Sequence, residues 1–141
     1  MTTNRTFVLD TNVLLVSISS KSRYHWIFQG LTHQEFKVAV TSDILSEYEE
    51  IISRKYSIPV ARNVIRTLLL LPNVIRTEVY YHWNLIQNDR DDDKFVDCAV
   101  ASNADAIVTH DRHFNVLESI PFPSLTILTI SEFKEVLSKQ G

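Results

Sequence analysis

Short apolar runs typical of β-strands alternate with amphipathic stretches typical of α-helices along almost the whole chain. The runs predicted as strands are 6–9, 36–40, 73–79, 106–110 and 125–130. The stretches predicted as helices are 11–19, 22–31, 41–56, 60–71, 91–103 and 131–139. This alternation predicts an α/β fold of three layers, in which a central, mostly parallel sheet is flanked by helices and its strands are joined by right-handed crossovers.

Residues with known end preferences mark several helix boundaries. Gly30 is expected to end the second helix and Pro72 the fourth. The run at 41–43 offers N-cap candidates for the third helix, and Ser131 offers one for the last helix. In the helix at 60–71, apolar residues cover much of the circumference of the last turns, which predicts either an exposed interface or a helix packed between two core layers.

The composition limits the classes of protein that the chain can form. A length of 141 residues predicts a single domain over 1–141, and 45% hydrophobic residues suffice for a full core. Cys98 is the only cysteine, which excludes an internal disulfide, argues against a Cys-based zinc site and fits the reducing cytoplasm. The first residues carry no signal-peptide pattern, and no run of roughly 18 apolar residues predicts a membrane span. A net charge of −3 predicts no general attraction to phosphate, so a nucleic-acid partner would have to be recognised at a local site.

Carboxylates from distant parts of the chain are predicted to meet at one edge of the sheet. Asp10 and Asp111 directly follow two predicted strands, and open parallel sheets form their sites outside the carboxyl ends of the strands. Glu47 lies about two turns into the helix at 41–56, and Asp93 lies near the start of the helix at 91–103. Four carboxylates in one cleft disfavour each other's ionisation unless a positive charge lies between them.

A hard divalent cation would supply that charge. Mg²⁺ prefers oxygen ligands and often completes its shell with substrate phosphate. Such an ion lowers the pKa of a bound water and stabilises a leaving oxygen, which is the chemistry of phosphodiester hydrolysis. The sequence shows no Ser–His–Asp or Cys–His arrangement, and its five histidines lack zinc-ligand spacing.

Three blocks of the sequence, in order, resemble the PIN-domain ribonucleases, which include the VapC-type toxins of toxin–antitoxin pairs. The blocks are FVLDTNVLL, TSDILSEYEEI and DRDDDKFVDCAVASNADAIVTHD, and the resemblance extends from about residue 6 to 137. It implies a PIN-like fold, Mg²⁺- or Mn²⁺-dependent cleavage of RNA, a possible antitoxin partner and a possible homodimer. The metal ligands and catalytic residues that it implies are Asp10, Glu47, Asp93 and Asp111.

Each of these acids also has a plain structural interpretation. Asp10 could be the N-cap of the helix that follows it, and Asp111 could be a turn residue. Glu47 could be a solvated helix residue like its neighbours Glu49 and Glu50.

The acidic run that contains Asp93 divides by position. Asp91 and Asp92 are expected to cap the helix or complement its dipole, and Asp89 to lie in a loop. Asp97 lies one turn after Asp93 on the same helix face, where it could contact a second metal ion or hydrogen-bond another site residue.

Other residues are predicted to support the acids or to bind substrate. Thr11, Asn12 and Thr109 could orient an acid or a metal-bound water, although Thr109 could equally pack its methyl group inward. His110 and His113 are more simply surface residues, and Cys98 a core residue. The candidates for phosphate contacts, each of which could instead be scattered surface charge, are Lys21, Arg23, Arg112, Arg62 and Arg66.

The residues and the resemblance together predict a metal-dependent ribonuclease that acts as the toxin of a toxin–antitoxin pair. One alternative is a catalytically weak PIN-fold binding module. A second is a haloacid-dehalogenase-type phosphohydrolase, which also begins with a strand ending in Asp. That mechanism requires a second Asp two positions on, where this chain has Asn12.

Overall fold

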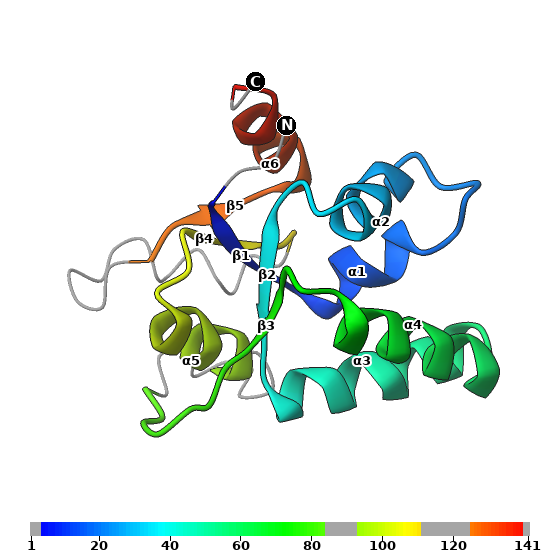
Figure 1. Cartoon of the computed structure of the whole chain (residues 1–141), viewed down its shortest axis with the longest axis horizontal. Helices are drawn as coiled ribbons and strands as arrows, with labels where there is room; N and C mark the ends of the chain where they lie inside the picture. The colour runs from blue at the N-terminus through cyan, green and yellow to red at the C-terminus, as the bar shows by residue number, and fades with distance from the viewer. Residues whose placement is uncertain (1–3, 84–92, 111–124, 140–141) are drawn as a thin grey trace.

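The computed structural model describes residues 4–83, 93–110 and 125–139. The described strands are β1 (Thr6–Leu9), β2 (Lys37–Val40), β3 (Val74–Arg76), β4 (Ala106–Val108) and β5 (Ile127–Leu128). The described helices are α1 (Thr11–Ser17), α2 (His25–Thr32), α3 (Ser42–Lys55), α4 (Ile58–Leu70), α5 (Asp93–Ser102) and α6 (Ile130–Ser138). Figure 1 shows the strands in the middle of the molecule with helices around them.

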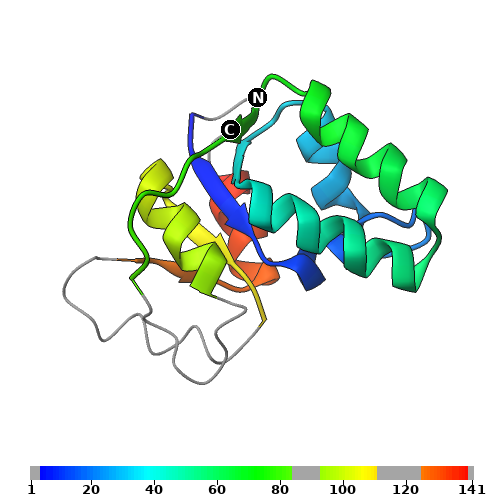
Figure 2. The same ribbon diagram turned by 90° about the horizontal axis from the view of Figure 1, so that it is seen from below.

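The strands form one five-stranded sheet in the order β3-β2-β1-β4-β5, and every pairing in it is parallel. Successive strands run outward from β1 to β3, and the chain then returns to β4 on the other side of β1. Because parallel crossovers are right-handed, this reversal places α5 on the opposite face of the sheet from α1 to α4. Figures 1 and 2 show α5 on one side and these four helices on the other. The predicted α/β architecture is confirmed.

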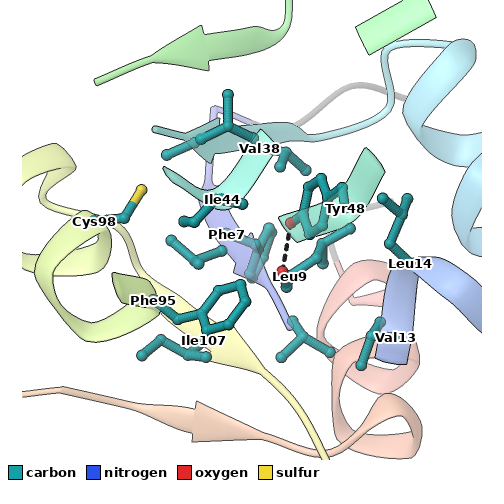
Figure 3. Close-up of a cluster of buried hydrophobic side chains, with 14 of the residues drawn as sticks. Phe7, Leu9, Val13, Leu14, Val38, Ile44, Tyr48, Phe95, Cys98 and Ile107 are labelled. Carbon is teal, nitrogen blue, oxygen red and sulfur yellow. Dashed lines mark hydrogen bonds between the residues drawn. The ribbon is translucent and has the colours of Figure 1, made fainter. Parts of the chain in front are cut away.

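The core consists of alternating strand residues and the apolar faces of the helices. On one face of the sheet, Phe7 packs edge-on against Phe36 and Phe133, and Trp26 lies 5.7 Å from the Phe133 ring. Figure 3 shows part of the buried cluster, in which side chains of strands and helices gather around β1. Cys98 is fully buried, as predicted, and burial followed by the nearby charge of Asp97 raises the pKa of its thiol to about 12. The thiol therefore stays protonated and unreactive at neutral pH.

Two helix ends differ from their predictions because side chains cap the backbone at other positions. The last helix begins one residue early, since Thr129 rather than Ser131 is its N-cap and forms a capping box with Glu132. The fourth helix begins at Ile58, since Ser57 accepts a hydrogen bond from the backbone N–H of Val60. Pro72 follows the end of this helix, as expected.

Gly30 does not end α2, which continues to Thr32. A Cβ atom at this position would lie 2.9 Å from the Phe36 ring, so glycine here allows the helix to pack closely on that side chain. The residue that reverses the chain is Gln34, whose φ is 59°. The second helix also begins three residues later than predicted, because Ser22 accepts a hydrogen bond from the Tyr24 N–H in a turn.

Candidate functional site

The carboxyl ends of β1 and β4 lie side by side at the point where the strand order reverses. This is the crevice in which open α/β sheets hold their ligands. Asp10 follows β1, and its backbone N–H donates a hydrogen bond to the Val108 carbonyl across the crevice at 3.0 Å. The hydroxyl of Thr109 donates to Asp10 Oδ2 at 2.8 Å. Asp10 precedes α1 but makes no side-chain cap hydrogen bond, so capping does not account for its carboxylate.

Glu47 connects the two segments that carry Asp10 and Asp93. Its Oε2 accepts a hydrogen bond from the hydroxyl of Thr11, which is next to Asp10 in the chain. Its Oε1 lies 2.6 Å from the ammonium of Lys94, which is next to Asp93. The Glu47 side chain is 20% exposed, unlike the exposed Glu49 and Glu50. The side chain of Glu47 therefore faces the site and is not a solvated helix residue.

Helix α5 contributes two buried carboxylates. Asp93 is its first residue and is 7% exposed, while Asp97 is 4% exposed and Asp10 is 5% exposed. Both oxygens of Asp97 have partners in the segment that follows β3: Oδ1 accepts from the Trp83 N–H at 3.0 Å, and Oδ2 lies 3.0 Å from His82 Nδ1. The two roles predicted for Asp97 are contact with a second metal ion and a hydrogen bond to another residue. Its described contacts are hydrogen bonds.

Tyr48 fixes α3 behind these acids. Its hydroxyl donates to the carbonyl of Leu9 at 2.5 Å, and Figure 3 shows this bond from α3 to the end of β1. Burial raises the pKa of Tyr48 well above its usual value, and the nearby carboxylates of Asp10 and Glu47 raise it further. Asp10 and Glu47 thus act on the same phenol, which stays protonated and can donate.

Two neighbouring clefts open beside the acids. The larger has a volume of about 550 Å³ and lies between the start of α3, the segment 77–82 and the start of α5, so that both Asp93 and Asp97 line it. The smaller has a volume of about 320 Å³ and includes Glu47. Lys94 lines both clefts. The acidic residues therefore border a space that is open to solvent and large enough for a ligand.

The donor set fits a hard divalent cation better than zinc. The described candidates are carboxylates of Asp10, Glu47 and Asp93, and buried carboxylates are stable when a cation or hydrogen bonds compensate their charge. Among the described residues, no three acidic, His or Cys side chains are close enough together to hold a metal ion. The ammonium of Lys94 compensates Glu47 in this structure, and the predicted fourth ligand, Asp111, lies outside the described residues.

The structure positions the other predicted residues as follows. Thr11 contacts Glu47 rather than Asp10, and Thr109 contacts Asp10, whereas Asn12 is exposed and makes no described contact with an acid. Lys21 and Arg23 are exposed in the loop between α1 and α2, which Figures 1 and 2 show on the side of the molecule away from α5.

The remaining candidates are either exposed or outside the described part of the chain. Arg62, Arg66 and His110 are exposed, the first two on α4. Arg112 and His113 lie outside the described residues, as do Asp89, Asp91 and Asp92.

Sequence reasoning did not identify Lys94, His82 or Trp83 as parts of the site. Lys94 directly follows Asp93 in an acidic run, so its positive charge was a usable signal. Its partner Glu47, however, lies on a different helix. The segment that contains His82 and Trp83 has no periodic pattern in the sequence. Its place in the site follows only from the contacts of these two residues with the buried Asp97.

We expect Lys94→Met to lower the free energy of unfolding of the metal-free protein by about 1–3 kcal/mol, because the partly buried Glu47 would lose its counter-charge. Urea unfolding measures this change. Lys139→Met is the matched control: its pair with Glu135 is exposed, so the change should stay within about 0.5 kcal/mol. Equal stabilities for wild type and Lys94→Met would contradict the assignment of Lys94 as the counter-charge.

In the described parts of the chain, no helix has both the length and the apolar character that a membrane span needs. The family model described as PIN domain matches residues 6–113. No curated protein matches the sequence.

Solved structures with a similar fold include two at low sequence identity. One is VapBC2 from Rickettsia felis bound to a DNA fragment from its promoter, with 18% identity, a TM-score of 0.60, and coverage of 88% of this chain and 98% of that chain. The other is the PIN domain of T. brucei RRP44, with 14% identity, a TM-score of 0.54, and coverage of 99% of this chain and 84% of that chain. At these identities the likeness shows a shared fold.

Proposed function

Because the chain belongs to the PIN-domain family, whose members are generally nucleases, we propose that it is a metal-dependent ribonuclease that hydrolyses RNA phosphodiester bonds. The observation that carries this proposal is that Asp10 and Asp93 are buried, that Glu47 contacts the chain neighbours of both, and that Asp93 lines an open cleft. Burying a carboxylate is unfavourable unless a cation or hydrogen bonds compensate its charge, and buried acids beside a cleft are therefore candidates for a functional site.

In this proposal Asp10, Glu47, Asp93 and Asp111 hold Mg²⁺ or Mn²⁺. The cation would supply an acidified water and would neutralise the charge that develops on the phosphate. The chain's own residues prepare the site for it. Thr109 orients Asp10, Thr11 orients Glu47, and the peptide N–H of Asp10 ties the two strand ends together.

Lys94 has a place in the same scheme. Its ammonium neutralises Glu47 in the protein alone and lies where the two clefts meet. A Lys is a mobile point charge that can exchange one anionic partner for another. With a cation on Glu47, Lys94 would be available to a phosphate of the RNA.

We also propose that the protein is the cytoplasmic toxin of a toxin–antitoxin pair, formed by the single domain 1–141. The likeness to VapBC2 supports this through the fold alone. The haloacid-dehalogenase alternative has no support from the family match. The binding-module alternative shares the PIN fold, and the presence of metal and activity decides between it and the nuclease.

The metal requirement can be tested without RNA. Mn²⁺ binds only the folded cluster, so a concentration about 100-fold above its Kd should raise the Tm by about 5–10 °C. Differential scanning calorimetry with and without Mn²⁺ measures the shift. An Asp10→Asn/Asp93→Asn double variant is the control and should show almost no shift. An equal shift in this variant, or none in wild type at millimolar Mn²⁺, would contradict metal binding at these acids.

Helix α4 is the surface that we propose for a homodimer. Its buried face contains Ala61, Val64 and Leu68, while Leu69 is exposed and Leu70 is 75% exposed, so the helix is not packed between two core layers. Exposed apolar side chains on one helix mark an interface. Light scattering at tens of micromolar protein should give a dimer mass that Leu70→Glu reduces to a monomer mass. A monomer mass for wild type would contradict the proposed dimer.

A further inference from the structure

The segment that follows β3 places exposed aromatic side chains beside the larger cleft. Thr77, Glu78, Val79, Tyr80 and His82 line the cleft on this side. Tyr80 is 88% exposed and Tyr81 is 64% exposed. Large aromatic rings left exposed at the wall of a cleft lose the stabilisation of burial, which is a cost that binding sites accept.

Contacts to α5 and within the segment hold these rings in position. Asp97 accepts the Trp83 N–H and lies against His82, which fixes the segment just after Tyr80. The hydroxyl of Tyr80 donates to Glu78. Tyr81 packs edge-on against Trp83 with ring centroids 4.7 Å apart, so these two rings contact each other while Tyr80 and His82 line the cleft. Tyr80 therefore lines the cleft on a backbone that these contacts support.

The charges of the cleft select the kind of ligand group that can lie against Tyr80. The lining contains more acidic than basic side chains: Asp43, Glu78, Asp93 and Asp97 against Lys94 and His82. Such a wall repels the phosphates of a nucleic acid except at Lys94 and at a bound cation. An uncharged base is not repelled, and its flat face matches an exposed aromatic ring.

We propose that Tyr80 stacks against an unpaired base of the RNA substrate and thereby positions the strand in this cleft. The inference rests on the proposed nuclease function. A base inside a duplex is already stacked between its neighbours and cannot reach the ring. The cleft volume of about 550 Å³ lies within the range of pockets that hold one small ligand, and Asp93 lines the same space. A base on Tyr80 would therefore bring a neighbouring phosphate to the acids.

Binding to two probes of equal charge tests this directly. A labelled oligouridylate and an abasic strand of the same length have the same phosphates, so the ratio of their affinities isolates the bases. Fluorescence anisotropy in chelator, where no metal supports cleavage, should show that wild type prefers the oligouridylate. Tyr80→Ala should weaken oligouridylate binding about five- to a hundredfold and leave the abasic strand unchanged.

Two variants separate stacking from other effects. Tyr80→Phe keeps the ring without its hydrogen bond to Glu78 and should bind like wild type. Tyr56→Ala removes an exposed tyrosine at the far end of α3, away from the cleft, and should also bind like wild type. Equal wild-type affinity for both strands, or a Tyr80→Ala protein that keeps the preference for bases, would overturn the proposal.

Cleavage assays with Mn²⁺ show which of the two proposals fails. If wild type cleaves single-stranded RNA and Tyr80→Ala has an unchanged KM, base stacking is wrong and the nuclease proposal stands. If wild type prefers the base-bearing strand but cleaves no RNA, base stacking stands and the nuclease proposal is wrong. A higher KM for Tyr80→Ala with a similar kcat, and faster cleavage of single-stranded than of duplex RNA, is the result that we expect.

Discussion

Replacing Asp10 with asparagine is expected to lower the rate of RNA cleavage more than about 100-fold while leaving the fold intact. The loss should exceed that typical of groups that merely support a metal ligand, because asparagine removes the charge that attracts the cation. The fold should survive because the amide oxygen can still accept the Thr109 hydroxyl, and because one like charge is removed from a crowded site. Initial rates on a single-stranded RNA at fixed Mn²⁺, with circular dichroism and Tm as controls, measure both effects.

The same assay ranks the other acids. Asp93→Asn and Asp111→Asn should lose as much as Asp10→Asn, and so should Glu47→Gln, whose side chain faces the site. Asp92→Asn is the matched control and should be nearly neutral, because asparagine caps a helix about as well as aspartate. If Asp92→Asn were as inactive as Asp93→Asn, the prediction that Asp93 binds the metal ion and Asp92 only supports the helix would be wrong.

Replacing Asp97 with asparagine is expected to lower the rate of cleavage by about 10–100-fold, a smaller loss than for any of these four acids. Its two carboxylate oxygens serve His82 and the Trp83 N–H, and these hydrogen bonds are strong because the acceptor is charged. Asparagine leaves one acceptor oxygen for two partners, so the segment that carries Tyr80 should loosen. Faster hydrogen exchange of the Trp83 amide, measured by NMR, should accompany the lower rate.

Two outcomes would contradict this role of Asp97. A wild-type cleavage rate together with faster Trp83 exchange would show that the position of the segment does not matter for catalysis. Unchanged Trp83 exchange together with a low rate would show that Asp97 acts on the metal rather than on the segment.

The fold could be predicted because its determinants are local. Apolar period and strand–helix alternation identify β1, β4 and their neighbours, and the rules for parallel sheets then order the layers. The errors at the starts of α4 and α6 came from side-chain capping. The Thr-x-x-Glu pattern of Thr129 and Glu132 is a stronger signal for the start of this helix than Ser131 alone.

The candidate site could be predicted only in part. Asp10 precedes a helix at a strand end, so topology alone positions it. The pairing of Lys94 with Glu47 joins two helices and depends on the rotamers of both side chains. The spacing of apolar residues in the sequence does not predict these rotamers. The same holds for the contact of Trp83 with Asp97, because an irregular segment provides no face from which a partner can be inferred.

Cleavage of a single-stranded RNA by the wild-type protein across a Mn²⁺ titration tests the central proposal most directly. The account predicts no cleavage in chelator, a rate that rises with Mn²⁺ and saturates over the concentration range that raises the Tm, and almost no cleavage by Asp93→Asn at any Mn²⁺ concentration. A rate that is independent of Mn²⁺, or an equal rate for Asp93→Asn, would contradict it.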